Sequence, residues 1–481
     1  MALVPTGACR PAGIAENGSR VIDLRFIPHA AAVAVLALVM GAAPATAKPN
    51  LVIFLSDDHG AIDSAPYGAG DVRTPNMTRL ASAGLLFEKA FVNSPACAPS
   101  RATLLTGLYP ARHGAEANHA KPHAELRKLP SFLQELGYEV VAFGKVAHYR
   151  YTKDYGFDHF AHDGFHEHAA IPAAIEFMQQ RTSDEPLCIF VGSNWPHVPW
   201  PMDQTIYAAD QVLLPPTFVN TPETLAARAR YYAAVEYMDD ELGRVYDAAR
   251  SKFGDDMFFL HTSDHGLQMP FGKWNLYDAG VRTAMIAVWP NFVAAGSRTD
   301  AMVQWMDILP TLVELAGGDP PRDIDGRSFV PVLRGEADSH RNEIYTTHSG
   351  DRDFNVFPMR SVRTAEWKYI RNLHPEFQFA THINRGGLRS GRRYWPSWLE
   401  AAEHDREALG VVDRYRRRPA EELFYVANDS HEQLNLAMDP RFSGKLAAMR
   451  DLLNKWLEQT NDPLAVFGNP LLHGEEPTMI E

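Results

Sequence analysis

The residues with the most specific potential for chemistry lie in one short stretch, residues 94–107. Pro99 suits the first position of a helix, where its missing N–H costs nothing, and Gly107 suits the left-handed residue that ends one. The spacing therefore predicts Cys97 directly before a helix N-terminus, where free N–H groups and the macrodipole favour an anion. An ordinary buried thiol is the alternative interpretation of this cysteine.

A pair of carboxylates, Asp57 and Asp58, closes the apolar run 50–56. A continuous apolar run predicts a strand covered on both faces, and open α/β sheets place their sites at the carboxyl ends of such strands. Adjacent carboxylates repel each other, so a cation between them explains the pair economically. A solvated acidic turn is the alternative.

Four basic side chains are candidates to bind an oxyanion or to carry a proton. Lys145, His148 and His197 lie just past the ends of predicted strands, and Lys273 lies in a loop. An ammonium group is a compact cation for an oxyanion, and histidine is the natural proton carrier near neutral pH. At each position taken alone, a surface lysine or a packed histidine is the competing interpretation.

The spacing of Cys97, Pro99, Ser100 and Arg101, closed by Gly107, resembles the signature of the type I sulfatases. In that family the cysteine is oxidised to formylglycine, an aldehyde that is hydrated to a diol. One diol oxygen attacks sulfur, and the other expels sulfate as the aldehyde reforms. The resemblance implies that Cys97 becomes 3-oxoalanine, made by a formylglycine-generating enzyme during maturation.

The same resemblance implies a metal site made by Asp57, Asp58, Asp264, His265 and residue 97. Mostly hard oxygen ligands favour Ca²⁺, whereas the softer His265 leaves Mg²⁺ or Mn²⁺ open.

The remaining catalytic roles are also implied by the family. Arg101 and the metal would orient the diol, and Lys145 and Lys273 would bind the sulfate oxygens. His197 would be the general acid or a sulfate ligand, and His148 would help the elimination.

For the fold, the resemblance implies an α/β protein of the alkaline-phosphatase-like type. A large mixed sheet is flanked by helices, and a smaller C-terminal antiparallel sheet with a helix follows. We expect a signal peptide at 1–47, a catalytic domain at 48–352 and a C-terminal subdomain at 353–481.

Four local expectations complete this picture. The apolar patterns predict single strands at 85–91 and 283–289 and a helix at 303–316, and residues 344–348 are expected to form the last strand of the large sheet.

Composition limits the remaining choices. The chain has 481 residues and a net charge of −13, which argues against a general nucleic-acid binder. Three arginines precede the apolar run 30–40, and a small-residue cleavage site follows at 45–47, as in a secretory signal. The run is too short for a comfortable transmembrane helix, and no later segment is long and apolar enough to span a bilayer. We therefore expect a periplasmic or secreted protein without a membrane span after cleavage.

Of the three cysteines, Cys9 lies in the predicted signal peptide. Cys188 lies in the buried strand predicted at 187–192, and we expect it to be structural and unpaired with Cys97.

The choice of substrate stays open. Residues 357–363 and 435–442 resemble the heparan N-sulfatase branch, whereas the Lys145/His148 spacing and the Asp264-His265 pair resemble the iduronate-sulfatase branch. N-sulfates and O-sulfates of sulfated sugars are both consistent with this pattern. Residues 385–398 form a basic, aromatic loop, either an anionic-sugar contact or a solvated surface; its members are Arg385, Arg389, Arg392, Arg393, Trp395 and Trp398.

Two other functions have to be weighed. One is a phosphate monoester or diester hydrolase of the same fold, although the second set of metal ligands expected of two-metal phosphatases is not evident in the sequence. The other is a sulfated-glycan-binding protein that has lost catalysis, against which the intact Cys97, Arg101, Lys145 and Lys273 argue.

Overall fold

The computed structural model describes residues 48–202, 207–351, 354–385 and 394–476. The predicted signal peptide and the arginines at 389, 392 and 393 lie outside these ranges. Within them, no helix is long and apolar enough to cross a lipid bilayer.

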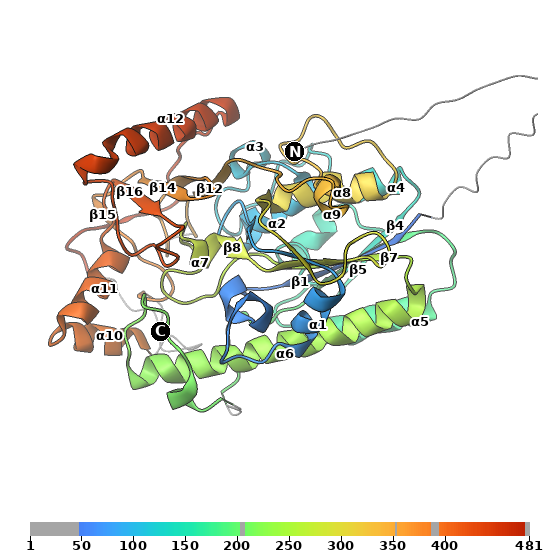
Figure 1. Ribbon diagram of the computed structural model, residues 1–481, viewed down its shortest axis with the longest axis horizontal. Helices are drawn as coiled ribbons and strands as arrows, with labels where there is room; N and C mark the ends of the chain where they lie inside the picture. The colour runs from blue at the N-terminus through green and yellow to red at the C-terminus, as the bar shows by residue number, and fades with distance from the viewer. Residues whose placement is uncertain (1–47, 203–206, 352–353, 386–393, 477–481) are drawn as a thin grey trace, which may run out of the picture. The chain divides into compact units, whose positions relative to one another are not determined.

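The core is a mixed eight-stranded sheet with β1 near its centre (Figure 1). β1 runs parallel to β6 on one side and to β7 on the other, so the carboxyl ends of all three strands meet at one edge. β9 is antiparallel to β7 and β2, which makes the sheet mixed. The spatial order is β10 (Ser297–Thr299), β2 (Leu85–Phe87), β9 (Met285–Val288), β7 (Met257–Ser263), β1 (Asn50–Ser56), β6 (Leu187–Gly192), β4 (Glu139–Gly144) and β5 (His159–Ala161).

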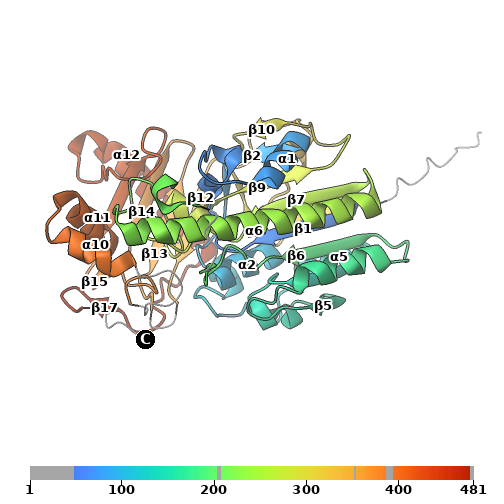
Figure 2. The same ribbon diagram turned by 90° about the horizontal axis from the view of Figure 1, so that it is seen from below.

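Helices cover both faces of this sheet. One face carries α1 (Pro75–Ala83), α5 (Ala170–Gln180) and α6 (Pro222–Phe253). The other face carries α2 (Cys97–Thr106), α4 (Leu129–Gln134), α8 (Ile308–Leu315) and α9 (Val330–Leu333). The β1 strand reads as a continuous apolar run because both of its faces are buried under these layers. Figure 2 shows α6 spanning the sheet lengthwise.

A smaller four-stranded antiparallel sheet follows in the chain. It contains β12 (Ile344–His348), β13 (Met359–Arg363), β14 (Trp367–Asn372) and β16 (Glu421–Tyr425). The helix α12 (Ser443–Thr460) packs on it through an apolar cluster that includes Leu453 and Trp456. The remaining strands and α-helices are β3 (Ala90–Phe91), β8 (Arg282–Thr283), β11 (Val303–Gln304), β15 (Phe377–Gln378), β17 (Leu471–Leu472), α3 (Pro110–His113), α7 (Asp278–Val281), α10 (Tyr394–Ala402) and α11 (Arg406–Arg416).

The large mixed sheet and the small antiparallel sheet confirm the predicted fold class. The expectation that residues 344–348 end the large sheet is wrong, because β12 pairs antiparallel with β13 of the small sheet. The expected strands at 85–91 and 283–289 each break into two strands that belong to different sheets. The expected helix at 303–316 begins as strand β11, and its α-helical part begins at Ile308.

Cys188 is buried in β6 and is not paired with Cys97, as expected.

Candidate active site

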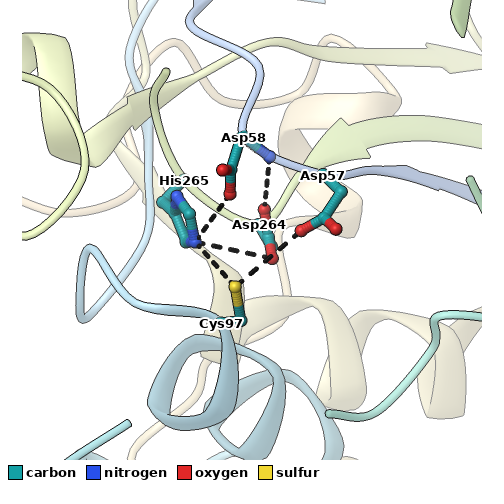
Figure 3. A group of neighbouring side chains, drawn as sticks. All are labelled: Asp57, Asp58, Cys97, Asp264 and His265. Carbon is teal, nitrogen blue, oxygen red and sulfur yellow. Dashed lines mark hydrogen bonds and ion pairs between the residues drawn. The ribbon is translucent and has the colours of Figure 1, made fainter. Parts of the chain in front are cut away.

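The ends of β1 and β7 bring the predicted metal ligands together. Asp57 and Asp58 follow β1, Asp264 and His265 follow β7, and the two strands are parallel neighbours. Cys97 approaches them from the start of α2 (Figure 3). All five side chains are buried, and one ligand atom from each lies within 4.8 Å of the others. This convergence follows from the parallel pairing, which brings two sequence-distant strand ends to one edge.

The candidate metal-ligand atoms of these five side chains lie close together. Cys97 Sγ lies 3.3 Å from His265 Nε2 and 3.9 Å from Asp57 Oδ1. His265 Nε2 lies 3.4 Å from Asp58 Oδ1, and the backbone N–H of Asp58 donates to Asp264 Oδ1 at 3.1 Å. Three buried carboxylates around one point fit a divalent cation, because carboxylate oxygens are the ligands that hard cations prefer.

The charge state of Asp58 supports that interpretation. Burial raises the pKa of Asp58 to about 7, although Lys273 and His265 act in the opposite direction. The surrounding protein groups stabilise the ionised form of Asp58 only in part. A bound cation would stabilise it further. Asp58 also has a left-handed backbone, with φ of 64°, which is uncommon for a non-glycine residue.

Within the described part of the chain, no second group of three or more Asp, Glu, His or Cys side chains converges in this way.

Three buried cations surround the carboxylates. Arg101 Nε donates to Asp264 Oδ2 at 2.9 Å, and the Arg101 guanidinium also lies 3.3 Å from Asp57 Oδ1. Lys145 Nζ donates to Asp57 Oδ2 at 2.5 Å and lies 3.5 Å from Cys97 Sγ. These contacts explain why positively charged groups tolerate full burial here.

The third cation, Lys273, donates to both oxygens of Asp58 at 2.9 and 3.0 Å. Burial raises the pKa of the Cys97 thiol, but Lys145 and Lys273 outweigh it and bring the pKa down to about 7. Position 97 is therefore a site where negative charge is stabilised.

The start of α2 differs by two residues from the sequence expectation. The helix begins at Cys97 itself, with Ala96 as its N-cap, so Pro99 is the third helical residue rather than the first. Gly107 does end the helix in the left-handed region, with φ of 70°. Ser100 Oγ donates to the carbonyl of Asp264 at 2.7 Å, which ties the helix to the end of β7.

His148 and His197 line the same cavity of about 450 Å³ as Cys97 and Lys273. Burial and the nearby Lys145 hold the pKa of each histidine well below its ordinary value. Nδ1 of His197 lies 2.5 Å from the carbonyl oxygen of Val198, so this nitrogen carries the proton in the neutral ring.

Several residues that line this cavity were missed by sequence reasoning. All but Tyr149, which begins a short 3₁₀ helix, come from loops, and none has a strand-end or periodic signal; the set is Asn118, His119, Tyr149, Phe165, Gln268, Trp274, Asp351 and His382. Trp274 stacks on His382 with ring centroids 5.0 Å apart, and Phe354 stacks on the same imidazole at 4.2 Å. Of these three stacked rings, Trp274 and His382 line the cavity together with Cys97 and Lys273.

Comparison with known proteins identifies the family. The sulfatase family model matches residues 49–318, more than half of the chain. This chain belongs to the sulfatase family. A second model, the N-sulphoglucosamine sulphohydrolase C-terminal region, matches residues 264–380. The relatives of this chain are named sulfatases and sulphohydrolases. These names confirm the predicted enzyme class, a sulfuric ester hydrolase.

Two curated relatives of this sulfatase cover most of both chains. An ulvan-active sulfatase of Formosa agariphila is 29% identical over 88% of this chain and 83% of its own. Human N-sulphoglucosamine sulphohydrolase is 28% identical over 87% of this chain and 91% of its own.

Solved structures share the fold of this sulfatase. A 2-O glycosaminoglycan sulfatase superposes with a TM-score of 0.66 at 22% identity, covering 90% of this chain and 99% of its own. The phosphonate monoester hydrolase of Agrobacterium radiobacter superposes with a TM-score of 0.67 at 18% identity, covering 86% and 96%.

Proposed function

We propose that this chain is an exported sulfatase that hydrolyses O-sulfate or N-sulfate groups on sulfated sugars, with residue 97 oxidised to formylglycine as its nucleophile. The observation that carries the proposal is the convergence of Cys97 with four metal-ligand candidates and three buried cations at one edge of the sheet.

Formylglycine would supply a hydrated aldehyde with two oxygens, one to attack sulfur and one to help release sulfate. A thiol cannot follow this route because it has no second oxygen on the same carbon. The lowered pKa of Cys97 supports a position built to stabilise negative charge. A formylglycine-generating enzyme would act on the chain during maturation.

The cation site is proposed to hold Ca²⁺. Asp57, Asp58 and Asp264 supply carboxylate oxygens, and the oxidised residue 97 would add another oxygen in place of sulfur. His265 is the one nitrogen ligand of the set and keeps Mg²⁺ and Mn²⁺ as alternatives. The ion would neutralise sulfate oxygens and help to orient the nucleophile.

The lysines would change partners when ion and substrate bind. Lys145 and Lys273 now pair with Asp57 and Asp58, the two carboxylates that a cation would also ligate. A bound cation would take over part of that charge, leaving the ammonium groups to bind sulfate oxygens as charge develops on them. Arg101 keeps Asp264 and Asp57 in place from the other side.

His197 is proposed to protonate the leaving oxygen or nitrogen. Its pKa is held low by burial and by Lys145 and Lys273. A negatively charged sulfate beside the ring would favour the imidazolium form, so the substrate itself would prepare this acid.

The sugar class is supported by the relatives. The names of two relatives specify ulvan and N-sulphoglucosamine, and one solved neighbour is described in complex with D-glucosamine-2-N,6-O-disulfate. Trp274 and His382 line the cavity and present flat ring faces of the kind that sugar rings pack against.

A phosphate or phosphonate ester hydrolase is the second candidate, because the phosphonate monoester hydrolase shares this fold. Turnover of 4-nitrophenyl sulfate and 4-nitrophenyl phosphate, followed by a panel of N- and O-sulfated disaccharides, separates the two. The proposal expects sulfate to be hydrolysed with the higher kcat/KM. A preference for phosphate would overturn it, and tight binding of sulfated sugars without any turnover would favour the non-catalytic alternative.

Export rests on the basic residues, apolar run and small-residue site within 1–47. Cell fractionation with N-terminal sequencing of the mature chain tests it. A cytoplasmic chain that retains residues 1–47 would contradict it.

A further inference from the structure

A chain of hydrogen-bonding side chains extends from His148 to a buried carboxylate. Nε2 of His148 lies 2.8 Å from Nδ1 of His119, and Nε2 of His119 lies 3.3 Å from Oδ1 of Asp351. His148 and Asp351 are buried, and His119 is half-buried between them. All three line the cavity that contains Cys97.

The carboxylate end of this chain is braced against the helix that carries Cys97. Oδ2 of Asp351 accepts a hydrogen bond from Nδ2 of Asn118 at 3.1 Å. Oδ1 of Asn118 in turn accepts from the backbone N–H of Ala98, the residue after Cys97, at 3.0 Å. The position of Asp351 is therefore coupled to the start of α2 through one amide side chain.

The middle member, His119, is held in an uncommon backbone conformation. Its φ is +66°, in the left-handed region that side chains with a Cβ rarely adopt. The hydroxyl of Tyr151 donates to the carbonyl of His119 at 3.0 Å and helps to hold it there. Such strain persists where surrounding contacts fix a residue, often at functional sites.

The positions of the protons on His119 and His148 follow from the charge of Asp351. Hydrogen bonds from His119 and Asn118 and the nearby His382 keep the pKa of Asp351 below its usual range, against the effect of burial. An ionised carboxylate can only accept, so His119 must donate from Nε2. In a neutral His119, Nδ1 then accepts, and Nε2 of His148 must carry the proton.

This assignment leaves Nδ1 of His148 without a proton. Among the described residues, that nitrogen is buried and has no hydrogen-bond partner. An unpartnered buried lone pair is costly unless it has a task or a ligand.

We propose that Asp351 and His119 are positioning residues that fix His148 in the tautomer whose Nδ1 lone pair is free to take a proton during sulfate release. This inference rests on the proposed function. In that step Nδ1 takes the proton from the remaining hydroxyl on oxidised residue 97. The electron pair of the O–H bond completes the aldehyde C=O bond. The C–O bond to sulfate would then break, and sulfate would leave with the electron pair of that C–O bond.

A kinetic test uses 4-nitrophenyl sulfate, which has no sugar, with His119→Ala and Asp351→Asn in the fully oxidised enzyme. If sulfate release is slowed, kcat falls about 10- to 100-fold, at or below the lower end of what a positioned base contributes. KM falls in proportion, so kcat/KM stays within about 3-fold, and a burst of about one 4-nitrophenol per active site precedes the steady state. His123→Ala, an exposed histidine four residues on, is the matched control and keeps wild-type constants.

Two kinetic results would overturn the inference. One is a kcat/KM that falls together with kcat, which indicates a role before sulfate release. The other is unchanged hydrolysis of the aryl sulfate with impaired hydrolysis of sulfated sugars, which assigns both residues to sugar binding.

A spectroscopic test does not depend on turnover. ¹⁵N spectra of ring-labelled histidine, recorded on the full chain with unmodified Cys97 and assigned with His148→Gln, report the tautomer directly. We expect His148 to carry its proton on Nε2 in the wild type and to lose this preference in His119→Ala. An Nδ1-protonated His148 in the wild type would overturn the inference, even if the enzyme proved not to be a sulfatase.

Discussion

This molecule contains two buried clusters of charged side chains that we expect to serve different purposes, one in catalysis and one in stabilising the fold. The site cluster lies where β1, β7 and α2 meet; its members are Asp57, Asp58, Asp264, Arg101, Lys145 and Lys273. The sheet-joining cluster connects α7 to the small sheet; its members are Asp278, Glu432, Arg363 and Lys368. Both contain carboxylates and cations in close contact, so burial of charge alone does not indicate catalysis.

The difference lies in how the carboxylates are arranged. Asp278 pairs with Arg363 at 3.1 Å and with Lys368 at 2.8 Å, and these cations outweigh burial and lower its pKa. Burial raises the pKa of Asp58 to about 7, but burial also raises the pKa of Glu432 in the sheet-joining cluster to about 7. A shifted pKa is therefore not the mark of the site. The mark is that three carboxylates, an imidazole and Cys97 face one point beside a cavity.

The largest expected effect comes from Asp264→Asn in the site cluster. This change removes a metal-ligand charge and the partner of Arg101 Nε, so turnover of sulfate esters should fall about 10³-fold or more. Steady-state kinetics with bound metal measured by elemental analysis checks it. Asp451→Asn, an exposed carboxylate on α12, is the matched control. Full metal occupancy with unchanged kcat in Asp264→Asn would show that Asp264 is not a metal ligand that turnover requires.

Lys273→Met should come next. Without the ammonium group, sulfate oxygens lose one charge-assisted contact, and kcat/KM should fall about 10²- to 10³-fold. Lys455→Met, an exposed lysine on α12, should leave kcat/KM unchanged. A Lys273→Met enzyme with normal kcat/KM would indicate that this lysine only neutralises Asp58.

Lys368→Met probes the other cluster. Removing one partner of a buried ion pair leaves Asp278 and Glu432 under-compensated and should lower the free energy of unfolding by about 3–5 kcal/mol. The kcat of the molecules that remain folded should not change. Urea unfolding and active-site-normalised kinetics measure the two quantities. A loss of kcat larger than the loss of folded protein would contradict the division between the clusters.

Chelation should have the smallest effect on stability. An ion present at 100 times its Kd stabilises the fold by about 2.7 kcal/mol, so EDTA should lower Tm by a few degrees and abolish turnover, and Ca²⁺ should restore both. Lys368→Met should show the same Tm shift on chelation, since distant sites contribute additively. An unchanged Tm and full activity after verified metal removal would rule out the cation site.

Much of this site could be predicted because its residues follow apolar strands. The run ending at Asp57 and Asp58 does become β1, and the strand before Asp264 is its parallel neighbour β7. What failed depended on tertiary context. An apolar run at 85–91 gives no sign that β2 and β3 belong to different sheets, and the pattern at 344–348 does not say which sheet accepts it. Loop residues such as His119 carry no periodic signal at all.

The chemical state of residue 97 decides whether this chain uses a formylglycine nucleophile. Mass spectrometry of the peptide spanning residues 94–107, from chain co-expressed with a formylglycine-generating enzyme, distinguishes aldehyde from thiol, and Cys97→Ala is the matched control. We expect an aldehyde at position 97, turnover in proportion to the fraction of chains that carry it, and a folded, inactive Cys97→Ala chain. An unmodified thiol in a fully active enzyme, or normal turnover by Cys97→Ala, would contradict it.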